Sequence, residues 1–230
     1  MSESRRFAVI GLGRFGMRLA RALAEAGAEV IAVDRNEHLI EDIRDQVTLA
    51  VSLDATDQKA LVAQGVDKVD IAVVGVGGAF ESCALTTSVL KQLGVPRVIS
   101  RATTRARGEI LMRIGADEII NPEAEAATRC ASRLTMPQVM ERIDLGKTHS
   151  LVQIRAPEAW RGKTLEQLSV RKKHKVNVVA IRRPRKGEKT DGETYLIDTP
   201  LPDSTIETGD MLLVVGTNEA IEALPKSSPS

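Results

Sequence analysis

The sequence predicts an α/β protein with a doubly wound parallel sheet in its first half, followed by a crossover helix and a small α+β unit. Three observations lead to this prediction. Short apolar runs alternate with segments of helical periodicity as far as Asn121-Pro122. Several helical segments are followed directly by a glycine, which favours the left-handed conformation that ends a helix. After Ser150, apolar and polar residues alternate instead, as in a sheet with one buried face.

The first strand and the first helix are joined by a glycine-rich turn. Phe7–Ile10 is apolar throughout, and Gly11, Gly13 and Gly16 follow it in the spacing G-x-G-x-x-G before a helical segment that ends at Ala26. In this pattern the first glycine turns sharply, the second lets backbone N–H groups approach a pyrophosphate, and the third lets helix and strand pack closely. The phosphate would lie at the positive end of the helix dipole. The turn therefore predicts a Rossmann-like nucleotide-binding unit.

A second predicted strand, Glu29–Val33, ends at Asp34, about where a carboxylate binds ribose hydroxyls in such units. The alternative role for Asp34 is to cap the next helix, a role that Asn36 could share. Further strands are expected at Thr48–Val51, Ile71–Val74, Val98–Ser100 and Glu118–Ile120. The helices between the strands are expected at Arg14–Ala26, Glu37–Gln46, Asp57–Gln64, Ala79–Leu93 and Arg105–Ile114, with Gly27, Gly65, Gly94 and Gly115 close behind them.

The regular alternation ends at residue 122, so we expect a nucleotide-binding domain over residues 1–122. A long helical segment from Glu123 to about Ile143, kinked at Pro137, predicts a crossover or linker over residues 123–148. It either contacts a second subunit or is the last helix of the same sheet. Residues 149–226 are expected to form the small α+β domain, whose first helix begins at the capping box of Thr164. Its other expected elements are strands at Ser150–Ala156, Val176–Arg182, Thr194–Ile197 and Met211–Val215, a charged turn at Arg185–Asp191, a helix at Thr217–Leu224 and a frayed tail at Lys226–Ser230.

The composition excludes several classes of protein. Aromatic residues make up only 2% of the chain, which argues against a surface that stacks nucleic-acid bases. The 32 basic and 31 acidic residues produce no general field for polyanions, so we expect no nucleic-acid partner. Cys83 and Cys130 are expected to be buried thiols of a reducing compartment. No apolar run approaches the roughly 18 residues of a membrane span, so we expect a cytoplasmic protein that reaches the membrane through a partner.

With these residues in place, the chain resembles the bacterial RCK-type regulatory subunits of Ktr/Trk potassium-uptake systems over nearly its whole length. The resemblance implies an N-lobe that binds an adenine nucleotide, either ATP/ADP or NAD/NADH, and a C-lobe that binds a second small effector. It also implies homodimers assembled into an octameric ring at the inner face of the membrane, beneath a membrane-embedded potassium channel or transporter subunit of the KtrB or TrkH type. The motifs that carry the resemblance are Phe7–Gly16, Glu29–Asp34, Asp54–Asp57, Ile114–Asp117 and Asn121–Glu123.

The resemblance assigns roles in the nucleotide site. The three glycines, with Arg14 and Phe15, would form the phosphate loop, and Arg14 would reach phosphates of its own or a neighbouring subunit. Asp34 would hold the ribose with Arg35 and Asn36 beside it. The residues assigned to the adenine are Asp54 and Ala55.

Three further residues follow later strands at the same edge of the sheet. Gly77 and Arg101 come after the fourth and fifth strands, and Arg101 is either a second phosphate ligand or part of an ion pair. The resemblance gives Glu123 a divalent cation such as Mg²⁺ at the subunit interface. The alternative for Glu123 is an acidic residue favoured by the dipole in the first turn of a helix.

The C-lobe contains a possible effector pocket. Leu165, Arg171, Asn177 and Val178 match the family's cyclic di-AMP pattern, whereas Glu166 and Ser169 stand where that pattern has an apolar residue and an aspartate. A carboxylate beside a phosphodiester is unfavourable unless it points away. The alternative is that the basic run at residues 171–175 is a solvated face of the protein.

We expect a non-enzymatic sensor whose ligand gates a potassium channel or transporter. The alternative is an NAD-dependent oxidoreductase, which requires a proton donor beside the nicotinamide. The three histidines, His38, His149 and His174, and the single tyrosine, Tyr195, do not fall at a strand end of the first domain. DNA binding through the basic run is a third alternative, without a recognisable groove-reading module.

Overall fold

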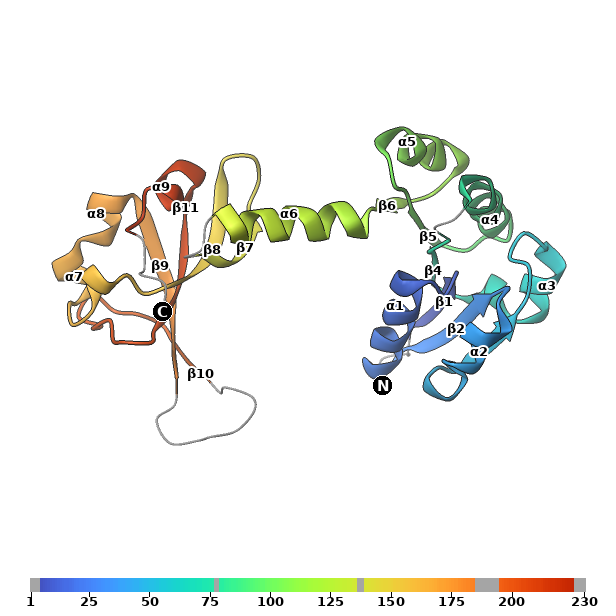
Figure 1. Ribbon diagram of the computed structural model, residues 1–230, viewed down its shortest axis with the longest axis horizontal. Helices are drawn as coiled ribbons and strands as arrows, with labels where there is room; N and C mark the ends of the chain where they lie inside the picture. Colours follow the sequence, from blue (N-terminus) through green and yellow to red (C-terminus); the bar gives the residue numbers. More distant parts are fainter. Residues whose placement is uncertain (1–4, 77–78, 136–138, 185–194, 226–230) are drawn as a thin grey trace. The chain divides into compact units, whose positions relative to one another are not determined.

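The computed structural model describes residues 5–76, 79–135, 139–184 and 195–225 (Figure 1). The chain divides into two compact units after Glu125, and each is described by itself. Several predicted features lie outside the described residues: Gly77, the kink at Pro137, the charged turn at Arg185–Asp191 and the tail at Lys226–Ser230.

A parallel six-stranded sheet forms the centre of the first unit, in the order β3-β2-β1-β4-β5-β6. Its strand order runs outward in both directions from β1 and β4, so the topology switches between these two strands and opens a crevice at their carboxyl ends. This arrangement confirms the predicted doubly wound sheet. The strands are β1 (Arg6–Ile10), β2 (Glu29–Asp34), β3 (Leu49–Ser52), β4 (Ile71–Val74), β5 (Arg97–Arg101) and β6 (Glu118–Ile120).

Helices cover both faces of this sheet. In β1, Ala8 and Ile10 pack with α3, α4 and α5, whereas Val9 packs on the other face with α1 and α2, because successive side chains of a strand point to opposite faces. All four predicted stop glycines have positive φ angles, as a left-handed residue at the end of a helix requires. The helices are α1 (Arg14–Glu25), α2 (Glu37–Glu41), α3 (Gln58–Ala63), α4 (Phe80–Gln92) and α5 (Arg105–Ile114), with 3₁₀ turns η1 (Arg44–Gln46) and η2 (Val66–Lys68).

The helix predicted at Glu37–Gln46 is interrupted. It ends at Glu41, and the N–H of Ile43 donates to the carbonyl of Ile40 at 3.3 Å, which tightens the chain into η1. Both isoleucines are buried in the same apolar cluster as α1. The tighter turn therefore keeps both side chains in the core where a continuous helix was expected.

The long helix predicted from Glu123 to Ile143 is wrong in its second part. Helix α6 (Pro122–Thr135) is followed by strand β7 (Val139–Asp144), which pairs antiparallel with β8 (His149–Arg155). Met140 and Ile143 are spaced like apolar residues on one face of a helix, but their side chains are 45% and 60% exposed. The buried residue of this strand is Val139, so the backbone pairing with β8, not the apolar period, decides its structure.

The prediction of two buried thiols holds for only one cysteine. Cys83 lies in α4 and is buried, whereas Cys130 lies in α6 and is exposed. Residues 123–131 of α6 are exposed throughout, because no sheet covers that helix within the described residues.

The second unit is built on an antiparallel sheet in the order β10-β9-β11-β8-β7. Its core includes the single tryptophan, Trp160, which is buried against the sheet. The predicted capping box is present: the N–H of Gln167 donates to Thr164 Oγ1 while the Gln167 side chain accepts from the Thr164 N–H. The remaining elements are β9 (Val176–Pro184), β10 (Tyr195–Asp198), β11 (Met211–Thr217), α7 (Leu165–Leu168), α8 (Val170–His174), α9 (Asn218–Glu222) and the 3₁₀ turn η3 (Glu158–Trp160).

One buried carboxylate stabilises this second unit. The side chain of Asp210 is fully buried, and Arg183 donates to both its oxygens, from Nε at 2.8 Å and from Nη2 at 2.9 Å. Charge-assisted bidentate pairs of this kind compensate the loss of hydration on burial. This pair joins β9 to the turn before β11.

Candidate functional site

A cavity of about 450 Å³ opens at the carboxyl edge of the parallel sheet. Its walls come from the loops that follow β1, β2, β3 and β4, from helix α4 and from Arg101 at the end of β5. The cavity therefore lies at the topological switch point, where ligands bind in open parallel sheets.

The three glycines of the first loop are required for different reasons. Gly11 has a φ of +91°, and a Cβ there would lie 2.9 Å from the backbone nitrogen of Val76. A Cβ at Gly16 would overlap the carbonyl oxygen of Gly11. A Cβ at Gly13 would meet no atom within 4 Å, although Gly13 lines the cavity. Packing within the chain thus explains Gly11 and Gly16, whereas no packing contact requires a glycine at position 13.

Gly13 is also the N-cap of α1, and no side chain caps this end of the helix. The first N–H groups of a helix lack intrahelical partners and carry the positive end of its dipole. An anion in the cavity would therefore find donors at the start of α1.

Asp34 links the end of β2 to the glycine loop. Its Oδ2 accepts a hydrogen bond from the N–H of Leu12 at 2.6 Å, and its Oδ1 accepts from the N–H of Asn36 at 2.9 Å. Each carboxylate oxygen retains a second lone pair for a ribose hydroxyl. The helix-capping role falls to Asn36, whose side chain accepts from the N–H of His38.

The loops after β2 and β3 are held together by an ion pair. Arg35 Nη2 donates to Asp54 Oδ1 at 2.6 Å, and both the N–H and the hydroxyl of Thr56 donate to the same carboxylate oxygen, at 2.9 and 2.7 Å. The hydrogen bond from Arg35, followed by those from Thr56, lowers the pKa of Asp54 to about 2. Ala55 is buried beside them and lines the cavity.

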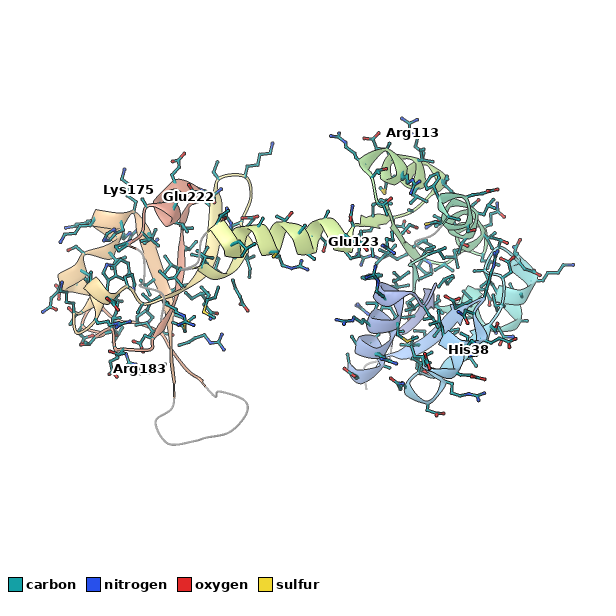
Figure 2. All side chains as sticks on the ribbon, viewed as in Figure 1. His38, Arg113, Glu123, Lys175, Arg183 and Glu222 are labelled. Carbon is teal, nitrogen blue, oxygen red and sulfur yellow. The ribbon has the colours of Figure 1, made fainter. Side chains whose placement is uncertain are left out.

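Besides Arg35, two arginines line the cavity, and they differ in their partners. Arg14 is exposed and makes no hydrogen bond or ion pair within the part of the chain that the structure describes. Arg101 forms an ion pair with Glu123, the second residue of α6, which Figure 2 labels at the start of that helix. Of the two roles predicted for Arg101, the structure therefore shows the ion pair at the sheet edge.

Four of the predicted site residues do not form the walls of the cavity: Phe15, Gly16, Asn36 and Glu123. Phe15 is half-buried beside Gly75 and supports the loop from behind. Glu123 has the Arg101 guanidinium as its neighbour, and the described residues contain no cluster of three or more His, Cys, Asp or Glu side chains that could hold a metal ion. Glu123 alone does not make a cation site in one chain.

The sequence reasoning missed several cavity residues. Gly75 and Val76 follow β4 at the same edge as the other loops, so the strand prediction alone could have indicated them. Ser82 and Thr86 are four residues apart on one face of α4, and Thr86 is buried although it is polar. Their spacing was a usable signal only once α4 was known to border this crevice.

A second cavity, of about 520 Å³, lies in the second unit between α7, α8, β9 and the segment Pro200–Pro202. It brings together all four predicted effector residues, Leu165, Arg171, Asn177 and Val178. Glu166 and Ser169 also line it, and Ser169 has a positive φ of 46° where it joins α7 to α8. The two departures from the cyclic di-AMP pattern therefore lie on the wall of the cavity and not elsewhere.

The TrkA-N domain family matches residues 7–122, and the TrkA-C domain family matches residues 150–227. The chain belongs to the TrkA-N/TrkA-C family. Over 96% of its length it is 36% identical to the Ktr system potassium uptake protein C of Bacillus subtilis, covering 96% of that protein. It is 30% identical to the Ktr system potassium uptake protein A of Vibrio alginolyticus, over 97% of both chains. These similarities confirm the predicted family.

Solved structures share the fold of this TrkA-N/TrkA-C chain. The GsuK RCK domain superimposes with a TM-score of 0.55 at 24% identity, covering 96% of this chain and 45% of that one, so this chain spans about half the length of that protein. A structure described as the GsuK channel bound to NAD gives a TM-score of 0.51 at 22% identity, covering 96% of this chain and 38% of that one. At these identities the likeness establishes the fold alone.

A dehydrogenase would need a proton donor in the TrkA-N cavity. Within the described residues, neither a histidine nor a tyrosine lines it. The His38 side chain is 93% exposed on α2, and the His174 ring lies against Trp160 in the TrkA-C domain, with the two ring planes tilted by 47°. Helices long and apolar enough to cross a bilayer are absent from the described parts of the chain.

Proposed function

We propose that this chain is the regulatory subunit of a Ktr-type potassium uptake system, and that it binds an adenine nucleotide in its TrkA-N cavity. The observation that carries the nucleotide assignment is Gly13. It caps α1 with no side-chain hydrogen bond and faces open space in the cavity, so backbone donors are exposed where a pyrophosphate would lie. The sequence similarity to Ktr uptake proteins, which extends over nearly the whole chain, supports a role in potassium uptake.

The nucleotide would extend along the strand ends. Its phosphates would bind at the start of α1 near Arg14, and its ribose would bind the free lone pairs of Asp34. Its adenine would lie against Ala55, where the loop is held by the Arg35–Asp54 ion pair. The volume of about 450 Å³ lies in the usual range of small-molecule sites.

Regulation requires that the ligands differ in their contacts. ATP and ADP, or NADH and NAD, shift an assembly between two shapes only if one of them binds one shape more tightly. Arg14 is an exposed cation at this cavity, and an additional phosphate could engage it, from its own or a neighbouring subunit. We propose this contact as the source of the difference between nucleotides.

Assembly is part of the proposal. We propose homodimers that combine into an octameric ring at the cytoplasmic face of the membrane, attached through a membrane-embedded potassium channel or transporter subunit. The exposed apolar side chains of Leu134 (72%), Ile143 (60%) and Leu145 (54%) support a homo-oligomeric contact, because each of them leaves apolar area in water.

The proposed Mg²⁺ would need ligands beyond Glu123. That residue would supply one carboxylate oxygen, and the phosphates or a second subunit would have to complete the coordination, since hard cations take six or more oxygens. Binding isotherms with and without Mg²⁺ test this part separately.

For the TrkA-C cavity we propose a small anionic effector, with cyclic di-AMP as the leading candidate. Arg171 and Asn177 would hold the phosphodiester, while the Glu166 carboxylate on the same wall opposes it unless it turns away. Arg171→Ala should abolish cyclic di-AMP binding and leave nucleotide binding in the TrkA-N cavity unchanged.

Calorimetric titration of ATP, ADP, NADH, NAD and cyclic di-AMP, with and without Mg²⁺, tests the proposal. Asp34→Ala and Arg171→Ala are each other's controls, because each should affect one cavity only. Native mass spectrometry of gently purified protein should show a multimer that retains nucleotide. A monomer indifferent to all five compounds would overturn the proposal, and turnover of hydroxy acids with NAD would favour the oxidoreductase.

A further inference from the structure

Arg101 and Glu123 link the nucleotide cavity to the first turn of α6. Arg101 is the last residue of β5 and lines the cavity, and its Nη2 donates to Glu123 Oε1. The Arg101 side chain is only 17% exposed, whereas that of Glu123 is 58% exposed. The guanidinium is therefore held at the cavity wall by a carboxylate that lies largely in water.

The hydrogen-bonding capacity of Arg101 is only partly used. Its Nε is buried and has no hydrogen-bond partner among the described residues. A buried donor without a partner costs free energy, so the present arrangement leaves an incentive to bind an additional acceptor. A phosphate in the cavity would be such an acceptor, with a bidentate geometry that matches a guanidinium.

We infer that Arg101 exchanges partners: it binds Glu123 when the cavity is empty and a ligand phosphate when the cavity is filled. Glu123 is then an intramolecular anion that competes with the phosphate for Arg101. This inference rests on the nucleotide binding proposed above, and it adds a specific regulatory contact to it. Occupancy of the cavity would reach α6 through the loss of this ion pair.

The position of Glu123 in the first turn of α6 means that this exchange of partners would affect that helix. Helix α6 begins at Pro122 and continues to Thr135, past the division of the chain into two units after Glu125. Release of Glu123 removes a contact that ties the first turn of this helix to β5. The segment that leads into the TrkA-C domain would thus respond to phosphate in the TrkA-N cavity.

The same two strands provide a matched control. Arg97, the first residue of β5, forms an ion pair with Glu118, the first residue of β6. This pair lies at the opposite end of β5 from Arg101, and neither residue lines the nucleotide cavity. Glu118→Gln removes the same charge from the same sheet without freeing a cavity arginine.

The test is a double-mutant cycle on ADP affinity in buffer without divalent cations, measured by calorimetry. Glu123→Gln should tighten ADP binding about fivefold, since an ion pair of this exposure contributes up to about that factor. Arg101→Gln should weaken binding about tenfold, and the double variant should bind like Arg101→Gln alone. Glu118→Gln should stay within about twofold of the unsubstituted protein.

Hydrogen exchange gives the second readout. ADP should speed amide exchange at Ala126–Cys130 in the unsubstituted protein, and Arg101→Gln should remove this response. If Glu123→Gln binds ADP no more tightly than the unsubstituted protein, or tightens equally when Arg101 is absent, the exchange of partners is refuted while nucleotide binding stands. If the unsubstituted protein binds no nucleotide at all, the proposed function fails and this inference fails with it.

Discussion

Replacing the glycines of the first loop one at a time separates the fold from the function. Gly13→Ala adds a methyl group that meets no atom within 4 Å, at a φ of −61° that alanine readily adopts. Loss of glycine at an N-cap costs about 0.5 kcal/mol, and the reduced entropy of the unfolded chain offsets about as much. We therefore expect a melting temperature within about 2 °C of the unsubstituted protein.

The same substitution should be costly for binding. The added methyl would occupy the space through which a pyrophosphate approaches the N–H groups at the start of α1. Losing one or two hydrogen bonds to a charged group costs about 2–3 kcal/mol, which corresponds to a loss of affinity of about 30- to 150-fold. Calorimetry with ADP measures this loss on a protein whose folding is intact.

Gly16→Ala should instead lower the stability of the fold, by a clash within the chain. Its Cβ would lie far inside the 3.4 Å of an ordinary van der Waals contact with the Gly11 carbonyl oxygen, so backbone must move at the centre of the core. Overpacking of this kind costs about 3 kcal/mol, which lowers the melting temperature of a unit of this size by about 10 °C. Undiminished ADP binding by folded Gly13→Ala would refute the phosphate assignment, and an unchanged melting temperature for Gly16→Ala would refute the packing argument.

Three further predictions concern charged groups. Asp34→Ala should weaken ADP binding at least tenfold in calorimetry, because it removes the proposed ribose ligand and the acceptor that orders the glycine loop. An unchanged Kd would show that the ribose binds elsewhere. Arg35→Ala should raise the pKa of Asp54 from about 2 toward 3.8 in a carboxyl NMR titration. The pKa of Asp54 is lower in the folded than in the unfolded protein, so the stabilisation by this carboxylate is present above about pH 4 and is lost as the pH falls toward 2. If the pKa stays near 2 in the Arg35→Ala variant, the shift comes from the other hydrogen-bond donors to Asp54. Arg183→Met should destabilise the second unit by about 3–5 kcal/mol, because Asp210 is left buried without its cation, and an unaltered thermal transition would contradict this.

Local patterns predicted most of the first unit. The strand at Ile71–Val74 begins and ends where the predicted apolar run does, because a strand buried between helices must be apolar along its whole length. The strand at Val139–Asp144 was missed, because its exposed apolar residues are three apart and it has a single buried residue. Only the pairing with β8 makes that segment extended.

In the candidate site too, some residues could be predicted from local patterns and others could not. The glycine spacing and Asp34 could be found in the sequence because their positions at the cavity follow from the local strand, turn and helix. The contribution of Ser82 and Thr86 could not, because it depends on which face of α4 borders the crevice. The ion pair of Arg35 with Asp54 likewise joins two loops that only the sheet brings together.

By itself, the sequence determined the alternation of strands and helices, the parallel sheet and the glycine-rich turn. These depend on periodicity, backbone sterics and glycine, which act within a few residues. The tertiary structure decided that Arg101 pairs with Glu123, that Cys130 stays exposed on α6 and that β7 joins the second sheet. The ion pair joins residues 22 positions apart, while the states of Cys130 and β7 depend on which other elements cover or pair with them. Local periodicity carries no information about these neighbours.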